Sequence, residues 1–203
     1  VFTADEISPY RQYSHGIYLQ EQLRYGPLQL LLGLRQEYFT DILNKQQSNE
    51  SRTTQRALIP RVGAVLTINK QINVYGTWVK GFEPQSASVQ SNPNTGAPFA
   101  PEQSQLLEVG AKSDWFDHRL SITTALFHLT KNNTLYNAGD AGNPDLLMQV
   151  GEEISKGVEV DVAGELLPNW SVVVNYAYTD AKITKTASGT EKDLGMQRPN
   201  TPR

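Results

Sequence analysis

The chain contains no cysteine, so neither a disulfide framework nor a thiolate metal site can be built from it. It also lacks a long apolar run. The most apolar stretch, residues 28–34, is interrupted by Gln29 and Gly33, whereas a helix that crosses a bilayer needs about 20 predominantly apolar residues. These absences exclude a disulfide-bonded scaffold and a transmembrane helix.

Neither sign of charge predominates. The 18 basic and 21 acidic residues give a net charge of −3, and they are mixed along the chain without a basic block. Domains that bind nucleic acid usually carry a basic stripe or patch. We therefore expect no nucleic-acid partner.

Motifs for catalysis are also missing. The three histidines are isolated, and the sequence has no phosphate loop, no Gly-x-Gly-x-x-Gly and no Gly-x-Ser-x-Gly. The adjacent Glu152 and Glu153 suit a solvated strand entrance better than a metal site. We therefore predict that the protein is not an enzyme and has no catalytic residue, metal site or covalently bound cofactor.

What the sequence does contain is a rhythm of alternating segments. Eight segments with period-two alternation cover residues 13–24, 28–40, 58–68, 71–82, 105–115, 119–130, 154–166 and 170–181. Short corners near residues 25–27, 69–70, 116–118 and 167–169 join them in pairs. Long polar segments, roughly 41–55, 83–103, 131–151 and 182–200, follow each pair. The segments exceed the five or six residues usual in soluble sheets and match the roughly 9 to 11 that a tilted strand needs to cross a bilayer.

In the last segment the alternation separates an apolar face from a face of small and polar side chains. The apolar set is Trp170, Val172, Val174, Tyr176 and Tyr178. Lipid would contact this face in a transmembrane barrel, whereas the apolar face of a soluble module such as a lipocalin-like barrel would point inward. The two interpretations predict opposite directions for Val158, Val160 and Val162.

The positions of the aromatic residues favour the membrane. Trp115 and Trp170 lie beside short corners, and Trp78 and Tyr178 lie near long connections, which is the arrangement of two interfacial girdles. In such barrels the short turns face the periplasm. We therefore predict an all-β fold: an antiparallel transmembrane β-barrel segment of about eight strands with short periplasmic turns and long extracellular loops.

Five residues are candidates for contact with a ligand. Phe99 and Tyr136 fall in predicted loops, where an aromatic ring stacks either on a ligand or within its own loop. Arg35, Glu37 and Lys112 fall on the predicted polar face, where they would line a translocation path or pair with charges on neighbouring strands or on an internal plug.

Six motifs then occur in a fixed order along residues 13–203. Residues 16–22 and 32–37 are similar to YLQDQ…LGLRYD, and residues 60–63 and 74–84 to PRVGLVY…LYASYSKGFxP. Residues 101–112 are similar to PExSxxxEVGxK, 125–133 to ALFxxxxxN, 151–159 to GExxSKGVE, and 175–181 to YAYTDA. Together they resemble the TonB-dependent siderophore receptors of bacterial outer membranes. Gln36 and Glu37 depart from the family's usual Tyr-Asp.

The resemblance implies uptake of a ferric siderophore with energy supplied through TonB. Members of this family have a barrel of about 22 strands with a plugged lumen, and their N-terminal plug carries the motif that contacts TonB. No plug is recognisable here, and residues 201–203 look like the start of a further strand. We therefore expect residues 1–203 to be part of the barrel domain, incomplete at both ends. The expected partners are TonB through the missing N-terminal part, a ferric siderophore, and outer-membrane lipid and lipopolysaccharide.

Other classes remain open at this point. A complete eight-stranded outer-membrane barrel with a structural or adhesive role would fit the strand count. A receptor of the same family for cobalamin, haem or carbohydrate would carry the same motifs.

Overall fold

The computed structural model describes residues 9–44, 47–167, 169–186 and 194–197. Eight strands form one antiparallel sheet in chain order. They are β1 (Tyr10–Tyr25), β2 (Leu28–Leu43), β3 (Ser51–Thr67), β4 (Ile72–Glu83), β5 (Glu102–Trp115), β6 (Leu120–Asn137), β7 (Leu147–Leu167) and β8 (Trp170–Lys185). Within the described residues the one helix is the short α1 (Ala87–Ser91), and none is long and apolar enough to cross a membrane. The predicted all-β antiparallel fold is confirmed.

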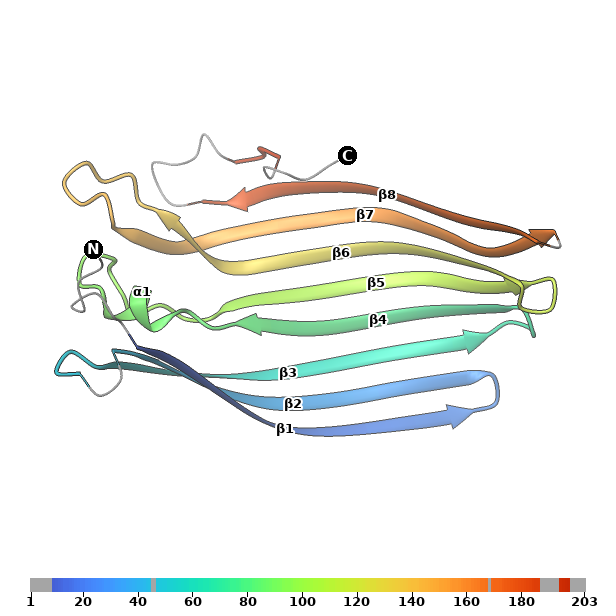
Figure 1. Ribbon diagram of the computed structural model, residues 1–203, viewed down its shortest axis with the longest axis horizontal. Coiled ribbons are helices and arrows are strands. Elements are labelled where there is room, and N and C mark those ends of the chain that lie inside the picture. The colour runs from blue at the N-terminus through green and yellow to red at the C-terminus, as the bar shows by residue number, and fades with distance from the viewer. Residues whose placement is uncertain (1–8, 45–46, 168, 187–193, 198–203) are drawn as a thin grey trace.

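Short and long connections lie at opposite ends of the sheet (Figure 1). The turns that join β1 to β2, β3 to β4, β5 to β6 and β7 to β8 share one end, called here the turn end, while α1 and the longer connections lie at the other, the loop end. In the β5–β6 turn Phe116, Asp117 and His118 all have positive φ, between 54° and 65°. The predicted turns are where the alternation placed them, although Pro168 and residues 201–203 lie outside the described residues.

The strands are longer at the loop end than the sequence suggested. β3 begins at Ser51 rather than at residue 58, β6 ends at Asn137 rather than at 130, and β7 begins at Leu147 rather than at 154. The predicted loops 41–55 and 131–151 are therefore too long. The β3 extension is almost entirely polar, and the hydroxyls of Thr40 and Thr54 lie 3.1 Å apart there. The β6 and β7 extensions carry scattered apolar residues such as Leu135 and Met148 but no apolar stripe of period two.

Strand pairing fixes the tilt of the sheet. One row of directly paired residues runs from Glu21 in β1 to Asp180 in β8, through Leu32, Val62, Trp78, Leu107, His128 and Lys156. Glu21 is four residues from the turn end of β1, whereas Asp180 is ten residues from the turn end of β8. The row thus climbs by about one residue per strand. Six residues over seven strand steps, with roughly 3.3 Å per residue and 4.8 Å between strands, give a tilt of about 30°, close to the roughly 35–45° of transmembrane barrels.

One face of the sheet carries a continuous apolar band. Its exposed members include Ile17, Leu19, Leu34, Leu58, Val62, Leu107, Val109, Leu126, Val174 and Tyr176. The pairing adds Val158, Val160 and Val162 to this face, opposite Tyr178, Tyr176 and Val174 of β8. Exposed apolar surface of this extent requires an apolar surrounding.

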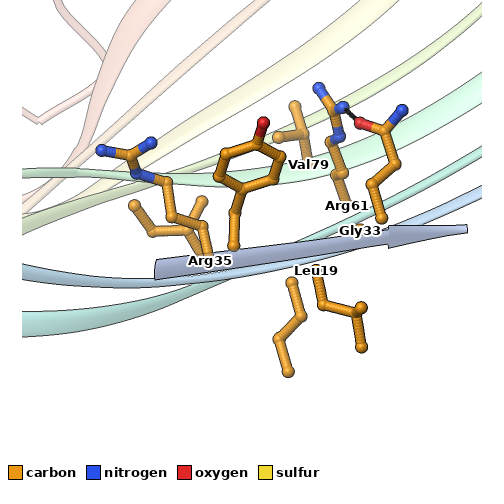
Figure 2. A pocket seen from close by; sticks show the side chains of 9 residues that line it. Leu19, Gly33, Arg35, Arg61 and Val79 are labelled. Atoms are coloured by element: carbon orange, nitrogen blue, oxygen red, sulfur yellow. Dashed lines mark hydrogen bonds between the residues drawn. The ribbon is translucent and has the colours of Figure 1, made fainter. Parts of the chain in front are cut away.

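The apolar band lies on the outside of the curved sheet. Figure 2 shows Leu19 on the opposite side of β1 and β2 from Arg35, Arg61 and Val79, which point to the side toward which the later strands curve. A lipocalin-like barrel would have the opposite arrangement, so that interpretation is wrong. β1 and β8 are the two edge strands, and within the described residues they do not pair with each other. The sheet is therefore open, unlike a complete eight-stranded barrel.

Candidate functional site: the polar inner face

An ion pair built over a glycine occupies the inner face of β1 and β2. Arg35 Nε donates to Glu37 Oε2 at 2.5 Å, and the Ser14 hydroxyl donates to Glu37 Oε1. Gly16 is paired directly with Glu37, and a Cβ at Gly16 would overlap the Arg35 guanidinium. The structure thus brings two predicted site residues together as a pair whose charges offset each other.

A second arginine lies over a second glycine. Its row of paired residues is two positions nearer the turn end than the row of Arg35. Arg61 of β3 is paired with Gly33 of β2, which is paired with Gln20 of β1, and Arg61 Nη2 donates to Gln20 Oε1. A hollow of about 350 Å³ lies here, lined in part by Tyr18, Gln20, Arg35 and Arg61. Sequence reasoning missed Arg61 because its face of β3 also carries Ile59 and Val65, which hides the polar periodicity.

The third predicted charge, Lys112, lies in another part of the inner face. Its Nζ is 5.6 Å from the centre of the Tyr75 ring, and the Tyr75 hydroxyl donates to Glu108 Oε1 at 2.8 Å. These three side chains line a separate hollow of about 370 Å³. Lys112 therefore shares neither a partner nor a hollow with Arg35.

Of the two candidate aromatic residues, Phe99 lies in a connection between elements, as predicted, and Tyr136 does not. Phe99 lies in the β4–β5 connection but is only 9% exposed. Its backbone N–H donates to Gln90 Oε1 at 2.8 Å, and its carbonyl accepts from Gln90 and Gln55. This low exposure favours the alternative in which the ring packs within its own connection.

Tyr136 lies in β6, so its predicted position in a loop is wrong. Its hydroxyl donates to Glu153 Oε1 at 2.9 Å, across to β7. The polar alternation of residues 131–137 gave no apolar stripe by which the strand could be recognised.

Further ion pairs lie at the loop end, beyond the apolar band. Lys131 Nζ is 2.6 Å from Glu102, and this hydrogen bond, opposed by partial burial, raises the pKa of Lys131. Lys185 Nζ is 2.7 Å from Glu152, and this bond lowers the pKa of Glu152, again against burial. Glu152 and Glu153 have different partners, and the described residues contain no cluster of three or more potential metal ligands of the His, Cys, Asp and Glu types.

A tilted antiparallel sheet with an apolar outside, a polar inside, short turns at one end and long connections at the other defines the wall of a transmembrane β-barrel. A family model described as "TonB dependent receptor-like, beta-barrel" matches residues 2–203. The chain belongs to this family of TonB-dependent receptors and transporters, which are not enzymes and reside in the outer membrane.

Two curated relatives carry names that specify their cargo. The metal-pseudopaline receptor CntO of Pseudomonas aeruginosa is 31% identical over 175 residues, which are 82% of this chain and 24% of the relative. The ferrichrome outer membrane transporter/phage receptor of Escherichia coli is 29% identical over 181 residues, 87% of this chain and 23% of the relative. The chain thus spans about a quarter of the length of these relatives.

A solved structure shares the fold. The siderophore receptor PiuA of Acinetobacter baumannii superposes with a TM-score of 0.80 at 24% identity, over 96% of this chain and 30% of the receptor. The predicted class, an antiparallel segment of a transmembrane barrel, is confirmed.

Proposed function

We propose that residues 1–203 form part of the barrel domain, incomplete at both ends, of an outer-membrane receptor that takes up a ferric siderophore with energy supplied through TonB. The observation that carries the proposal is family membership over almost the whole chain, together with relatives whose names include ferrichrome and ferric pyoverdine. TonB would act through a part of the receptor outside this chain. Lipid and lipopolysaccharide would contact the apolar band.

The inner face supplies the wall of the transport path in this proposal. Arg35, Glu37 and Lys112 lie on that face, and the Tyr136–Glu153 pair lies at its loop end. Phe99 fits a role in holding the β4–β5 connection closed, because its ring is buried. The chemistry required is binding and passage, with no bond made or broken in the cargo.

Growth of an iron-starved host tests the proposal. The complete gene is expressed in a Gram-negative strain that lacks its own siderophore receptors, in otherwise matched backgrounds with and without TonB. We expect one ferric siderophore to restore growth only in the strain with TonB. Rescue by haem alone, no rescue by any siderophore tested, or rescue without TonB, would contradict it.

A second candidate cargo is a chelate of another metal. The 31% identical relative is named as a receptor for a metal–pseudopaline complex. Uptake of radiolabelled divalent metals other than iron, presented with that chelator and measured in the same strains, distinguishes this cargo from a ferric one.

A further inference from the structure

The row Gln20–Gly33–Arg61 crosses three strands on the inner face. Arg61 reaches over Gly33 to Gln20, and a Cβ built on Gly33 would lie 2.7 Å from Arg61 Cγ and 2.8 Å from its Nε. Real Cβ atoms do not approach so closely, so glycine is what lets the arginine stem lie flat against the sheet. Gly33 beneath the arginine stem and the hydrogen bond to Gln20 together position the guanidinium (Figure 2).

The neighbouring arginine is built in the same way but has a different partner. Arg35 lies over Gly16 and is paired with the carboxylate of Glu37, which also accepts from Ser14. Arg61 lies over Gly33 and is held by a neutral amide. The wall thus contains two arginines that each lie over a glycine. Arg35 has a counter-charge within the sheet, and Arg61 has none among the residues that the structure describes.

Arg61 has N–H groups beyond the one that it donates to Gln20. A guanidinium has five N–H groups in a planar fork, and Gln20 accepts from Nη2. No ion pair to Arg61 is found among the described residues. The hollow of about 350 Å³ beside it also has Tyr18 in its lining, with a side chain that is 70% exposed. A fixed guanidinium with a free edge is suited to donating two parallel hydrogen bonds to one carboxylate.

We propose that Arg61, positioned by Gln20 and Gly33, binds a carboxylate presented from inside the barrel. The same chemistry has two possible sources: an acidic side chain from another part of the receptor, or a free or metal-bound carboxylate that enters the lumen. The first source depends only on the fold. The second rests on the proposed transport function.

The test uses the complete receptor, purified in detergent without ligand. Arg61→Gln removes the charge, Arg61→Lys keeps the charge without the fork, and Gln20→Glu gives Arg61 a carboxylate within the wall. Gln22→Glu is the matched control, because it adds the same charge to the same face of β1 two residues away. Thermal unfolding is recorded at pH 7 and pH 4, with and without sodium citrate as the carboxylate probe.

An internal carboxylate predicts that Arg61→Gln and Gln20→Glu both lower Tm at pH 7, that Arg61→Lys loses less, and that the losses shrink at pH 4. A carboxylate that enters from solution predicts instead that citrate raises the Tm of the wild type and of Gln22→Glu. The apparent citrate affinity then falls about tenfold or more in Arg61→Gln and Gln20→Glu, as expected for loss of a charged hydrogen-bonded pair.

The proposal is overturned if Arg61→Gln and Gln20→Glu both unfold as the wild type does and citrate acts equally on all variants. It is also overturned if Gln22→Glu matches Gln20→Glu, because the effect would then come from added charge alone. None of these readings requires transport. A failure of the growth test therefore leaves this test intact, and the reverse also holds.

Discussion

The carboxylate of Asp41 accepts a hydrogen bond from the backbone N–H of Ala87 at 2.6 Å, although the two residues are 46 positions apart. Asp41 lies near the loop end of β2, Ala87 is the first residue of α1, and both are fully buried. The first N–H groups of a helix have no partner within it. Asp41 therefore supplies an acceptor that α1 lacks and holds the β4–β5 connection against β2.

Asp41→Ala should release this connection without unfolding the sheet. A buried N–H left without an acceptor costs about 1–3 kcal/mol, and the N–H of Ala87 belongs to the connection of residues 84–101. We expect faster protease cleavage within these residues on intact cells that express the complete receptor. The control is Asp145→Ala, which removes an exposed carboxylate from the β6–β7 connection. Equal cleavage rates in Asp41→Ala and the wild type would show that the Asp41–Ala87 hydrogen bond does not hold the connection.

The apolar band should not tolerate charge. Val162 lies in this band between Ile122 and Val174, about midway between the aromatic girdles. An arginine at the bilayer midplane of a barrel costs about 2–4 kcal/mol. We expect Val162→Arg to reduce the fraction of receptor that assembles into the membrane, measured by the mobility shift between heated and unheated samples.

Thr123→Arg is the comparison for Val162→Arg. Thr123 is paired with Asp161 and with Lys112 on the inner face, so its arginine would have one opposite and one like charge beside it, both away from the apolar band. Assembly of Thr123→Arg should stay close to that of the wild type. If both variants assemble equally well, the assignment of the two faces is wrong.

The part of the fold that carries the apolar band was predictable from sequence. Lipid outside and a polar space inside force apolar and polar residues to alternate, and this gave the eight strands and their faces, as in the run from Trp170 to Tyr178. The tight turns were also predictable because polar and proline-containing corners interrupt the alternation. Beyond the apolar band no such constraint acts, and the extensions of β3, β6 and β7 were therefore missed.

The contacts between distant segments were not predictable. Asp41 and Ala87 are brought together by the folding of a connection that has no periodic pattern, and a single aspartate gives no signal of its partner. Arg35 and Glu37 were recognised as polar-face residues, but their pairing over Gly16 depends on strand register. Arg61 shares its face with apolar residues, so its importance emerges only from the row that links it to Gln20.

Two glycines on the inner face should respond differently to the same substitution. A Cβ on Gly157 would overlap the carbonyl oxygen of Tyr178 in the neighbouring strand, whereas a Cβ on Gly63 would have its nearest neighbour, Leu31, at 3.8 Å. The first contact is with backbone, which cannot rotate away. Gly157→Ala should therefore destabilise the wall by about 1–3 kcal/mol, as overpacking does, and reduce assembled receptor.

Gly63→Ala provides the control, because the same methyl group there makes an ordinary van der Waals contact. Its assembly should match that of the wild type. A result in which Gly63→Ala is the more damaging variant would contradict the close approach of β7 and β8 at Gly157.

The loop end of the β7–β8 hairpin should loosen in acid. Glu152 accepts from Lys185 Nζ at 2.7 Å and from the Thr184 hydroxyl at 2.9 Å, and chiefly the Lys185 bond lowers the pKa of Glu152 below its ordinary value of 4.5. A carboxyl whose pKa is lower in the folded state contributes stability above its unfolded pKa and loses it as the pH falls through the folded value. Amide protection of residues 147–154 should therefore fall as the pH drops below 4.5.

Glu152→Gln should already have weaker protection at pH 7 and should show little further change in the acid range, because its side chain does not titrate. Asp145→Asn neutralises an exposed carboxylate of the adjoining connection and should keep the wild-type profile. Hydrogen exchange of the complete receptor, expressed as protection factors so that the intrinsic pH dependence cancels, distinguishes them. If Glu152→Gln and the wild type lose protection in parallel, another group is responsible for the acid response.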